Sequence, residues 1–276
     1  MSKAVIVSTA RTPLTKSWKG AFNMTHGATL GGHAIRQAVE RAGIDPAEVE
    51  DVLMGCANPE GATGWNIARQ CALAGGLPIS VSGVTINRFC SSGLQTIAMA
   101  AQRIIAGEGD TYVAGGVESI SCVQQEMNMH MFQDPILLKS KPEIYWPMLQ
   151  TAEQVAKRYG ISREAMDEYG AASQQKACAA QAAGKFKDEI VGVSIPQRKG
   201  DPIVFETDEF INKKTNAEAL AGLRPAFDKA GSVTAGNASG INDGAAAVVV
   251  MSAKKAAALG LKPLARIASF GTSGLD

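Results

Sequence analysis

Net charge is nearly absent from this sequence, in which 27 lysine and arginine residues offset 26 aspartate and glutamate residues and leave +1 at neutral pH. Nucleic acids and anionic membrane surfaces are usually bound through an excess of basic residues. The composition therefore gives no reason to expect a nucleic-acid or a membrane partner. We expect a ligand that is recognised by local groups.

Long apolar runs are lacking too. The most apolar late stretch, Ala245 to Met251, has the length of a buried strand and is far too short for a membrane span. Near the amino terminus, Ala4 to Val7 has the pattern of a strand and not the charged start and apolar centre of a signal peptide. With 46% hydrophobic and 19% charged residues, the chain can bury a large core.

The five cysteines lack the close spacing of a zinc site or a disulfide framework. Successive cysteines are 15, 19, 32 and 56 positions apart, so no Cys-x-x-Cys pair occurs. An odd number of cysteines in a chain of this length is not typical of a secreted disulfide scaffold. We expect reduced thiols, a cytoplasmic location and no bound metal.

Strand and helix patterns alternate along the chain, which predicts an α/β fold with a mixed, largely parallel sheet and helices on both faces. Helices are predicted at 30–42, where Gly43 ends the helix, and at 66–74. The sequence Asp45-Pro46-Ala47-Glu48 is predicted to start another helix. The predicted strands are 4–7, 52–55, 81–86, 112–114, 190–195 and 245–251.

The pattern changes after Glu118, because 119–149 shows no clear periodicity and reads as an inserted, loop-rich region. The sequence Thr151-Ala152-Glu153-Gln154 then has the form of a capping box that opens a helix. A further helix is predicted from about Arg163, and its expected apolar face consists of Ala165, Met166, Tyr169 and Ala172.

Cys90 stands where the strand 81–86 turns into a helix. The apolar residues that recur at helical spacing after it are Leu94, Ile97, Ala98, Ala101 and Ile105. A thiol at this junction faces the unpaired N–H groups of the first helical turn, which favour the nucleophilic thiolate and could also hold an oxyanion. Ser91, Ser92 and Gly93 leave room for a substrate. The alternative is that Cys90 is one more small buried hydrophobic residue.

The run Asn-Arg-Phe-Cys-Ser-Ser-Gly-Leu-Gln at 87–95 resembles the nucleophile motif of the thiolases, enzymes that cleave or form 3-ketoacyl-CoA thioesters. Other segments resemble thiolase segments in the same order, and they are 10–13, 115–119, 151–153, 223–228 and 234–244. The resemblance extends over the whole chain and implies one half of a layered helix-sheet-helix-sheet-helix fold. It places a core domain at 1–118 and 242–268, a loop domain that binds CoA at 119–241, and the start of a connection to a second half at 269–276.

Thiolases are longer than this chain, and their second half carries an Asn-Glu-Ala-Phe segment, a Gly-His-Pro histidine that activates the nucleophile, and a second cysteine. None of His26, His33 and His130 stands in a Gly-His-Pro sequence. We therefore expect the 276 residues alone to be inactive or nearly so. We also expect exposed core surface, and with it a homo-oligomer, dimer or tetramer, or a partner chain that supplies the second half.

The resemblance implies that Cys90 is the catalytic nucleophile of an acetyl-CoA C-acyltransferase or acetyltransferase, with CoA thioesters as substrates and no permanently bound cofactor. The residues that it places along the pantetheine arm or the acyl site are Ser239, Ala235, Phe227 and Met148. Two segments depart from the family pattern, namely 145–150 and the sequence Asn212-Lys213-Lys214, which stands where many relatives carry an arginine near the nucleotide.

Two alternatives remain open at this point. The chain could be a non-catalytic CoA-binding or assembly subunit that needs a partner chain. It could also be a condensing enzyme of the ketosynthase type, although such enzymes frame their cysteine differently from the sequence at 87–93.

Overall fold

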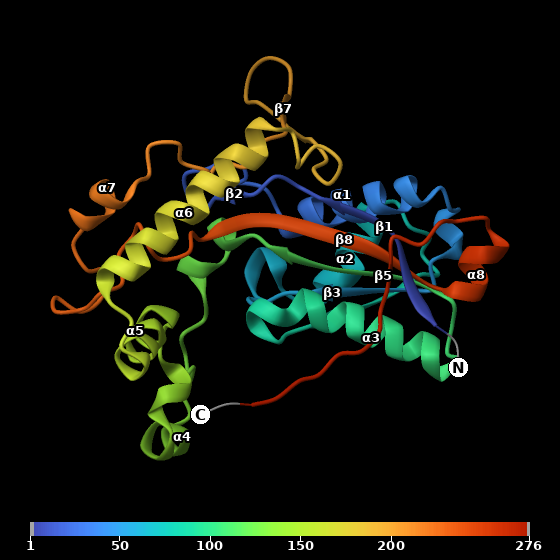
Figure 1. Cartoon of the computed structure of the whole chain (residues 1–276). Helices are drawn as coiled ribbons and strands as arrows, with labels where there is room; N and C mark the ends of the chain where they lie inside the picture. The colour runs from blue at the N-terminus through green and yellow to red at the C-terminus, as the bar shows by residue number, and fades with distance from the viewer. Residues whose placement is uncertain (1–2, 275–276) are drawn as a thin grey trace. The chain divides into compact units, whose positions relative to one another are not determined.

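The computed structural model describes residues 3–274, which divide into two compact units. Among the described residues, unit 1 contains 3–127, 187–209 and 242–274, and unit 2 contains 128–186 and 210–241. Figure 1 follows the chain through both. Of the predicted connection at 269–276, the last two residues lie outside the described part.

Residues 187–209 belong to unit 1, although we expected them in the loop domain at 119–241. The reason is an ion-pair clamp, in which the Arg11 guanidinium lies 2.9 Å from the Glu189 carboxylate and 2.8 Å from that of Asp208. The Phe205 ring also packs edge-on against the Phe22 ring, with 5.8 Å between centroids. Contacts between residues almost 200 positions apart leave no pattern in the sequence.

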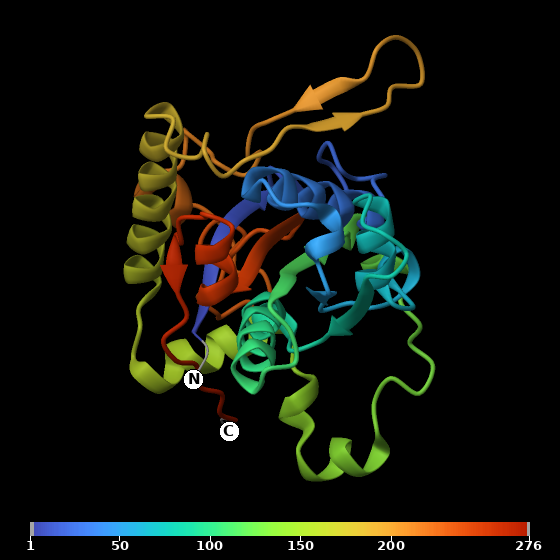
Figure 2. The ribbon, with the colours of Figure 1, turned by 90° about the vertical axis from the view of Figure 1, so that its right-hand side faces the viewer.

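Unit 1 is built on a mixed sheet. Its strands are β1 (Ala4–Arg11), β2 (Thr15–Lys16), β3 (Asp51–Gly55), β4 (Ser82–Ile86), β5 (Thr111–Glu118), β6 (Val193–Ile195), β7 (Ile203–Phe205), β8 (Asn242–Ser252) and β9 (Ala265–Arg266). Within residues 3–274 the main sheet has seven strands in the order β4-β3-β5-β8-β1-β9, with β2 paired to β8. Strands β6 and β7 form a separate hairpin (Figure 2).

The predicted α/β fold with a mixed sheet is confirmed, although fewer neighbouring strands are parallel than expected. Strand β3 pairs in parallel with β4 and β5. Strand β8 runs between β5 and β1 and is antiparallel to both. The late apolar segment therefore enters the middle of the sheet and separates strands that share one direction.

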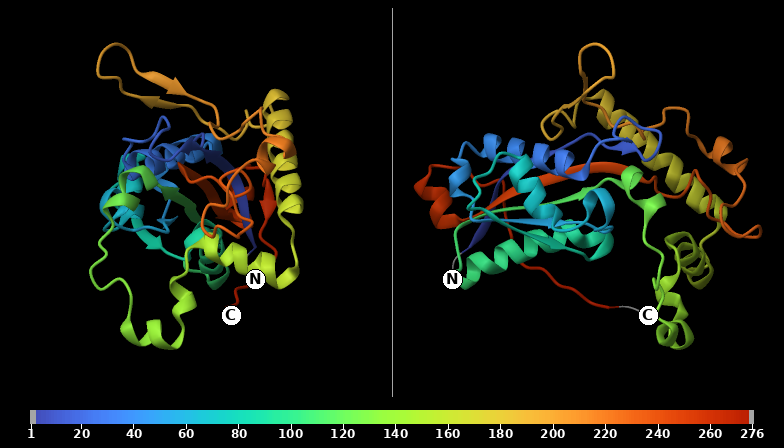
Figure 3. Two further views of the ribbon diagram at one scale, coloured as in Figure 1. Left: turned by 90° about the vertical axis from the view of Figure 1, so that its left-hand side faces the viewer. Right: turned by 180° about the vertical axis from the view of Figure 1, so that it is seen from behind.

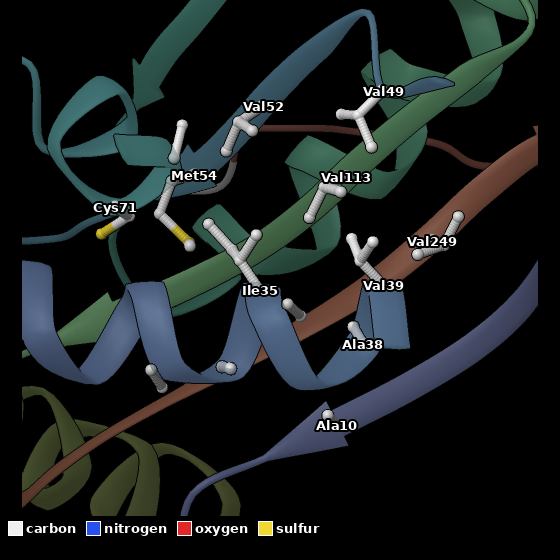
Figure 4. Packing of buried hydrophobic residues seen from close by; sticks show 14 of the residues in the cluster. Ala10, Ile35, Ala38, Val39, Val49, Val52, Met54, Cys71, Val113 and Val249 are labelled. Carbon is white, nitrogen blue, oxygen red and sulfur yellow. The ribbon is translucent and has the colours of Figure 1, made fainter. Parts of the chain in front are cut away.

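Helices cover both faces of this sheet. The helices of unit 1 are α1 (Gly27–Ala42), α2 (Ile67–Ala74), α3 (Ser92–Ala106) and α8 (Ala253–Ala258). Because side chains alternate along a strand, Val52 and Met54 of β3 pack with α1 and α2, and Leu53 packs with α3. Figure 3 shows α1 and α3 on opposite sides of the sheet, and Figure 4 shows the cluster between α1 and the strands.

Several of these elements were predicted correctly from local sequence signals. Helix α1 ends at the predicted Gly43, which has the left-handed φ of 66°. The predicted helix after Asp45 is wrong, because only one 3₁₀ turn forms at Pro46–Glu48 before the chain becomes extended at the buried Val49. Glu48 does not reach back to the cap and instead pairs with Lys255 at 2.5 Å.

Helix α3 buries only part of the predicted face, namely Ala98 and Ala101. Leu94 is 69% exposed and Ile105 is 48% exposed, so the expected apolar stripe is partly wrong. The buried side chains of α3 are mostly small, and they are Ser92, Thr96, Ala98, Ala100, Ala101 and Ile104. Small side chains let α3 lie close to the sheet, and this proximity outweighs the larger apolar area of Leu94.

The helices of unit 2 are α4 (Pro135–Ser140), α5 (Met148–Tyr159), α6 (Arg163–Ala182) and α7 (Ala217–Ala221). Helix α5 already begins at Met148, so the predicted capping box at 151–154 is wrong. The predicted apolar face of α6 is also wrong, because Tyr169 is 79% exposed and Asp167 and Ala171 are buried. An Arg163–Asp167 ion pair at 2.8 Å sets the buried side instead.

Candidate functional site

Cys90 lies in a single 3₁₀ turn, Phe89–Ser91, that joins β4 to α3. The predicted strand-to-helix junction is therefore confirmed. The Cys90 side chain is exposed, so the alternative of a small buried hydrophobic residue is wrong. Ser91 is the N-cap of α3 and makes no capping hydrogen bond with its side chain. The Ser92 N–H, the first of α3, bonds to the Phe89 carbonyl, and Ser91 leaves the N–H groups after it without a side-chain cap, beside an accessible thiol.

Hydrogen bonds on both sides hold the turn around Cys90. The Asn87 Oδ1 accepts a bond of 2.8 Å from the Phe89 N–H. The Ser92 hydroxyl accepts a bond of 2.8 Å from the Arg88 N–H and donates one of 2.6 Å to the Phe89 carbonyl. These bonds fix Phe89 at a φ of +45°, which is unfavourable for a large side chain and marks stored backbone strain.

A glycine on the neighbouring strand sets the position of the turn. A Cβ atom on Gly55, the last residue of β3, would lie 2.6 Å from the Ser92 carbonyl carbon and 2.7 Å from the Gly93 nitrogen. The start of α3 can therefore lie against β3 only because residue 55 has no side chain. The close approach of these two backbone segments thus positions the start of α3, directly after the turn that carries Cys90.

Two other thiols of unit 1 are buried. Burial, and next the Glu118 carboxylate, raises the pKa of Cys56 to about 11. Burial, and next the neighbouring Cys56, raises the pKa of Cys71 to about 12. Both thiols remain protonated at neutral pH and do not compete with Cys90 as nucleophiles.

The histidines of unit 1 lie with α1, on the face of the sheet opposite the one that α3 covers. His26 caps α1 through its Nδ1, and His33 lies within α1, where burial and next Arg36 lower its pKa. Helix α1 covers the face opposite α3. His130 belongs to unit 2. In the described part of unit 1, no histidine of the α3 face is available as a base for Cys90.

The residues expected along the CoA arm belong to unit 2 and are exposed: Phe227, Ala235, Ser239 and Met148. The structure brings Ala235 and Ser239 onto one turn, in which the Ala238 N–H donates to the Thr234 carbonyl at 3.0 Å. Phe227 follows a bridge that pairs 225 with 234. Met148 is the first residue of α5 and is 67% exposed.

Comparisons with known proteins show the family of this chain. The sequence profile of the family described as "Thiolase, N-terminal domain" matches residues 4–254. The chain belongs to the thiolase family. It is 48% identical over 287 aligned positions to an acetyl-CoA acetyltransferase of Cupriavidus necator, and it is 46% identical to a 3-ketoacyl-CoA thiolase of Bacillus subtilis. Each alignment covers 100% of this chain and 72% of the relative.

A solved structure shows the same fold. The acetyl-CoA acetyltransferase of Bacillus anthracis superposes with a TM-score of 0.91 at 39% identity, over 100% of this chain and 72% of that one. The predicted thiolase resemblance is thereby confirmed for both sequence and fold. Among residues 3–274 of this thiolase-family chain, no helix has the length and apolar character of a membrane span, and no three metal-binding side chains gather as a site.

One residue of unit 2 has a role that its sequence pattern did not reveal. Glu153, expected to cap a helix, lies within α5, and its carboxylate accepts bonds from the N–H groups of Ser232 (2.8 Å) and Val233 (2.7 Å) and from the Ser232 hydroxyl (2.8 Å). Partial burial alone would raise the pKa of Glu153, but these bonds outweigh it and lower the pKa. Glu153 therefore anchors the loop that leads into the Ala235 turn.

The same turn has a second anchor. Asn237 accepts a bond of 2.7 Å from the Thr234 N–H through its Oδ1, and its Nδ2 donates one of 2.9 Å to the buried Asp167 carboxylate. Asp167 also accepts a bond of 2.8 Å from the Arg163 Nε. Arg163 and Asp167 of α6 thus anchor the 234–239 turn through Asn237.

Replacing Glu153 with glutamine is expected to lower the stability of unit 2 by about 1–3 kcal/mol at neutral pH, since the remaining bonds lose their charge and an NH₂ group replaces one of the two acceptor oxygens. Because the folded-state pKa of Glu153 is lowered, its contribution is fully present above the unfolded-state pKa and disappears as the pH falls through the folded value. Hydrogen exchange of the Ser232 and Val233 amides should show faster opening in the variant at pH 7 and a much smaller difference in acid. Replacement of the exposed Glu168 with glutamine is the control, and equal exchange in all three proteins would contradict the assignment.

Proposed function

We propose that this thiolase-family chain carries the nucleophile of an acyltransferase that cleaves or forms 3-ketoacyl-CoA, and that Cys90 is that nucleophile. In the cleavage direction, the Cys90 thiolate attacks the 3-keto carbon and the bond between C2 and C3 breaks. Acetyl-CoA leaves as its carbanion and takes up a proton. The thiol of a second CoA then displaces the acyl group from Cys90, which yields the shortened acyl-CoA and restores the free thiol.

The observation that carries this proposal is the accessible thiol of Cys90 beside the first turn of α3, at which Ser91 makes no side-chain cap. Helix N-termini stabilise anions, and the same N–H groups can hold the oxyanion that forms during acyl transfer. The substrate class is supported by the names of the relatives, which are an acetyl-CoA acetyltransferase and a 3-ketoacyl-CoA thiolase.

Cys90 is expected to react with iodoacetamide at least about ten times faster than the partly exposed Cys122 and Cys178, because its thiol is exposed and lies beside the first turn of α3. The buried Cys56 and Cys71 should stay unlabelled in the folded protein. Peptide mass spectrometry at short labelling times measures all five thiols in one sample. Acetyl-CoA should acetylate the same residue. Faster labelling of any other cysteine would contradict the assignment of Cys90 as the nucleophile.

The CoA contacts are part of the same proposal. Ser239 and Ala235 would contact the pantetheine arm, Phe227 would flank it and Met148 would line the acyl site, so that 119–241 acts as a CoA-binding loop domain. The exposure of all four side chains and the two anchors of the 234–239 turn support these roles. Asn212, Lys213 and Lys214 lie in an exposed segment, in which the Lys214 N–H bonds to the Asn212 Oδ1 at 3.0 Å.

We further propose that the 276 residues alone do not complete the catalytic cycle and that the chain acts as a homo-oligomer or with a chain that supplies a base. The position of His26 and His33 on the opposite face of the sheet supports the need for another base. The exposed apolar side chains of Phe89 and Leu94 support a partner. A non-catalytic CoA-binding subunit is the second candidate, and an unreactive Cys90 would favour it.

A further inference from the structure

We infer that Asn87 and Glu118 are positioning residues for Cys90, linked to it through the segment 56–58. Asn87 holds the turn that presents the thiol, and Glu118 holds the segment on which Asn87 rests. This inference rests on the proposed function, because it assumes that Cys90 is the nucleophile.

The first link is the side-chain amide of Asn87. Its Oδ1 accepts the bond from the Phe89 N–H at 2.8 Å, and its Nδ2 donates a bond of 3.1 Å to the Ala57 carbonyl. One planar group therefore joins the residue before Cys90 to a segment 30 positions away in the chain. Because Phe89 has a positive φ, the turn needs support of this kind to keep its conformation.

The second link fixes the segment that Asn87 contacts. The Ala57 N–H donates a short hydrogen bond to the Glu118 carboxylate at the end of β5. Burial raises the pKa of Glu118, and the bonds from Ala57 and from the backbone and side chain of Asn58 oppose this rise without cancelling it. On the other side of the segment, the Thr63 hydroxyl donates to the Asn58 carbonyl at 2.5 Å.

These contacts form one continuous path in unit 1, from the Glu118 carboxylate through Ala57 and Asn87 to the Phe89 N–H and the Cys90 turn. Each step is a hydrogen bond with its own donor and acceptor, so each can be removed separately. Loss of either end should leave the buried core of unit 1 in place, because Cys71 and its neighbours in that cluster pack between α1, α2 and the sheet.

The test compares Asn87→Ala, Asn87→Asp, Glu118→Ala and Glu118→Gln with the wild-type chain. Iodoacetamide labelling of Cys90 is followed from about pH 6 to about pH 9, because the rate tracks the thiolate fraction. Asn87→Ala and Glu118→Ala should slow labelling about five- to tenfold at neutral pH and move the pH profile to higher pH. Glu118→Gln keeps an acceptor for the Ala57 N–H and should retain most of the rate. Asn87→Asp keeps only the acceptor for Phe89 and should be intermediate.

Cys71 serves as an internal reporter of folding, since a merely structural role would expose Cys71 without shifting the Cys90 profile. Replacement of the exposed Glu126 with glutamine is the matched control and should change nothing. If Cys90 of the wild-type chain is not the fastest thiol, the proposed function fails. If Cys90 is the fastest but the alanine variants keep its rate and profile, or label Cys71 in parallel, the positioning inference alone is overturned. Should an alanine variant not fold, the profiles of Asn87→Asp and Glu118→Gln decide by the same criteria.

Discussion

The 276-residue chain, assayed alone with acetoacetyl-CoA and CoA, is expected to turn over at less than about 0.1 s⁻¹. Enzymes commonly reach about 10 s⁻¹, and a positioned general base contributes about 10²–10⁴ to such a rate. Both proton transfers of the proposed reaction, from the thiol and at the substrate's α-carbon, need such a base. His26 and His33 lie with α1 on the face of the sheet opposite α3.

The assay follows the loss of acetoacetyl-CoA, and the same preparation is labelled with iodoacetamide to show that Cys90 is reactive. A Cys90→Ala variant gives the background rate. Slow turnover together with a reactive Cys90 is the expected combination, because it separates an intact nucleophile from a missing base. Turnover near 10 s⁻¹ would show that a base exists within these residues and would overturn the proposal that they are insufficient.

The strand-to-helix junction that carries Cys90, the proposed nucleophile, could be predicted from the sequence because its signals are local. A strand pattern, a cysteine and a helical pattern follow one another within 81–106, and the structure has β4, a 3₁₀ turn and α3 in that order. The end of α1 at Gly43 was equally local, since only the left-handed conformation of one residue was needed. Elements and junctions of this kind depend on neighbours in the chain.

The side chains that support the Cys90 turn and the 234–239 turn could not be predicted from local sequence signals. The bond from Ala57 to Glu118 spans 61 positions, and those from Ser232 and Val233 to Glu153 span 79 and 80. Glu153 in particular had a plausible local interpretation as part of a capping box. The interpretation failed because the chain entered α5 three positions before Thr151, which left the carboxylate inside the helix and available to a distant loop.

Helix faces failed for a different physical reason. The hydrophobic pattern of α3 predicts a face that includes Leu94, Ala98 and Ala101, but of these only the two alanines are buried, because small side chains permit close approach to the sheet. In α6 the buried side carries Asp167, whose charge is paired with Arg163 and bonded to Asn237. A periodic pattern measures the apolar character of a face and contains no information on the shape or charge of the surface opposite.

The close approach of β3 and α3 also leads to a large expected effect on stability. Gly55→Ala should lower the free energy of unfolding of unit 1 by about 1–3 kcal/mol, and Gly55→Val should lower it further or prevent folding. The added Cβ would lie 2.6 Å from the Ser92 carbonyl carbon, and backbone atoms cannot move aside as a flexible side chain can. The direction of this change in the free energy of unfolding is informative, because alanine in a strand or helix is otherwise more favourable than glycine.

Gly93→Ala is the matched control on the other side of the same contact. A Cβ there would meet only the Gly115 carbonyl oxygen, at 3.9 Å, and Gly93 lies in the first turn of α3, so alanine should raise stability by up to about 1 kcal/mol. Labelling of the buried Cys71 as a function of urea concentration reports the unfolding of unit 1 in each variant. Any displacement of α3 in Gly55→Ala also moves the Cys90 turn, so Cys90 should label more slowly in that variant even without denaturant. If the alanine variants at 55 and 93 are equally stable and label alike at Cys90, the contact between β3 and α3 does not set the position of the thiol.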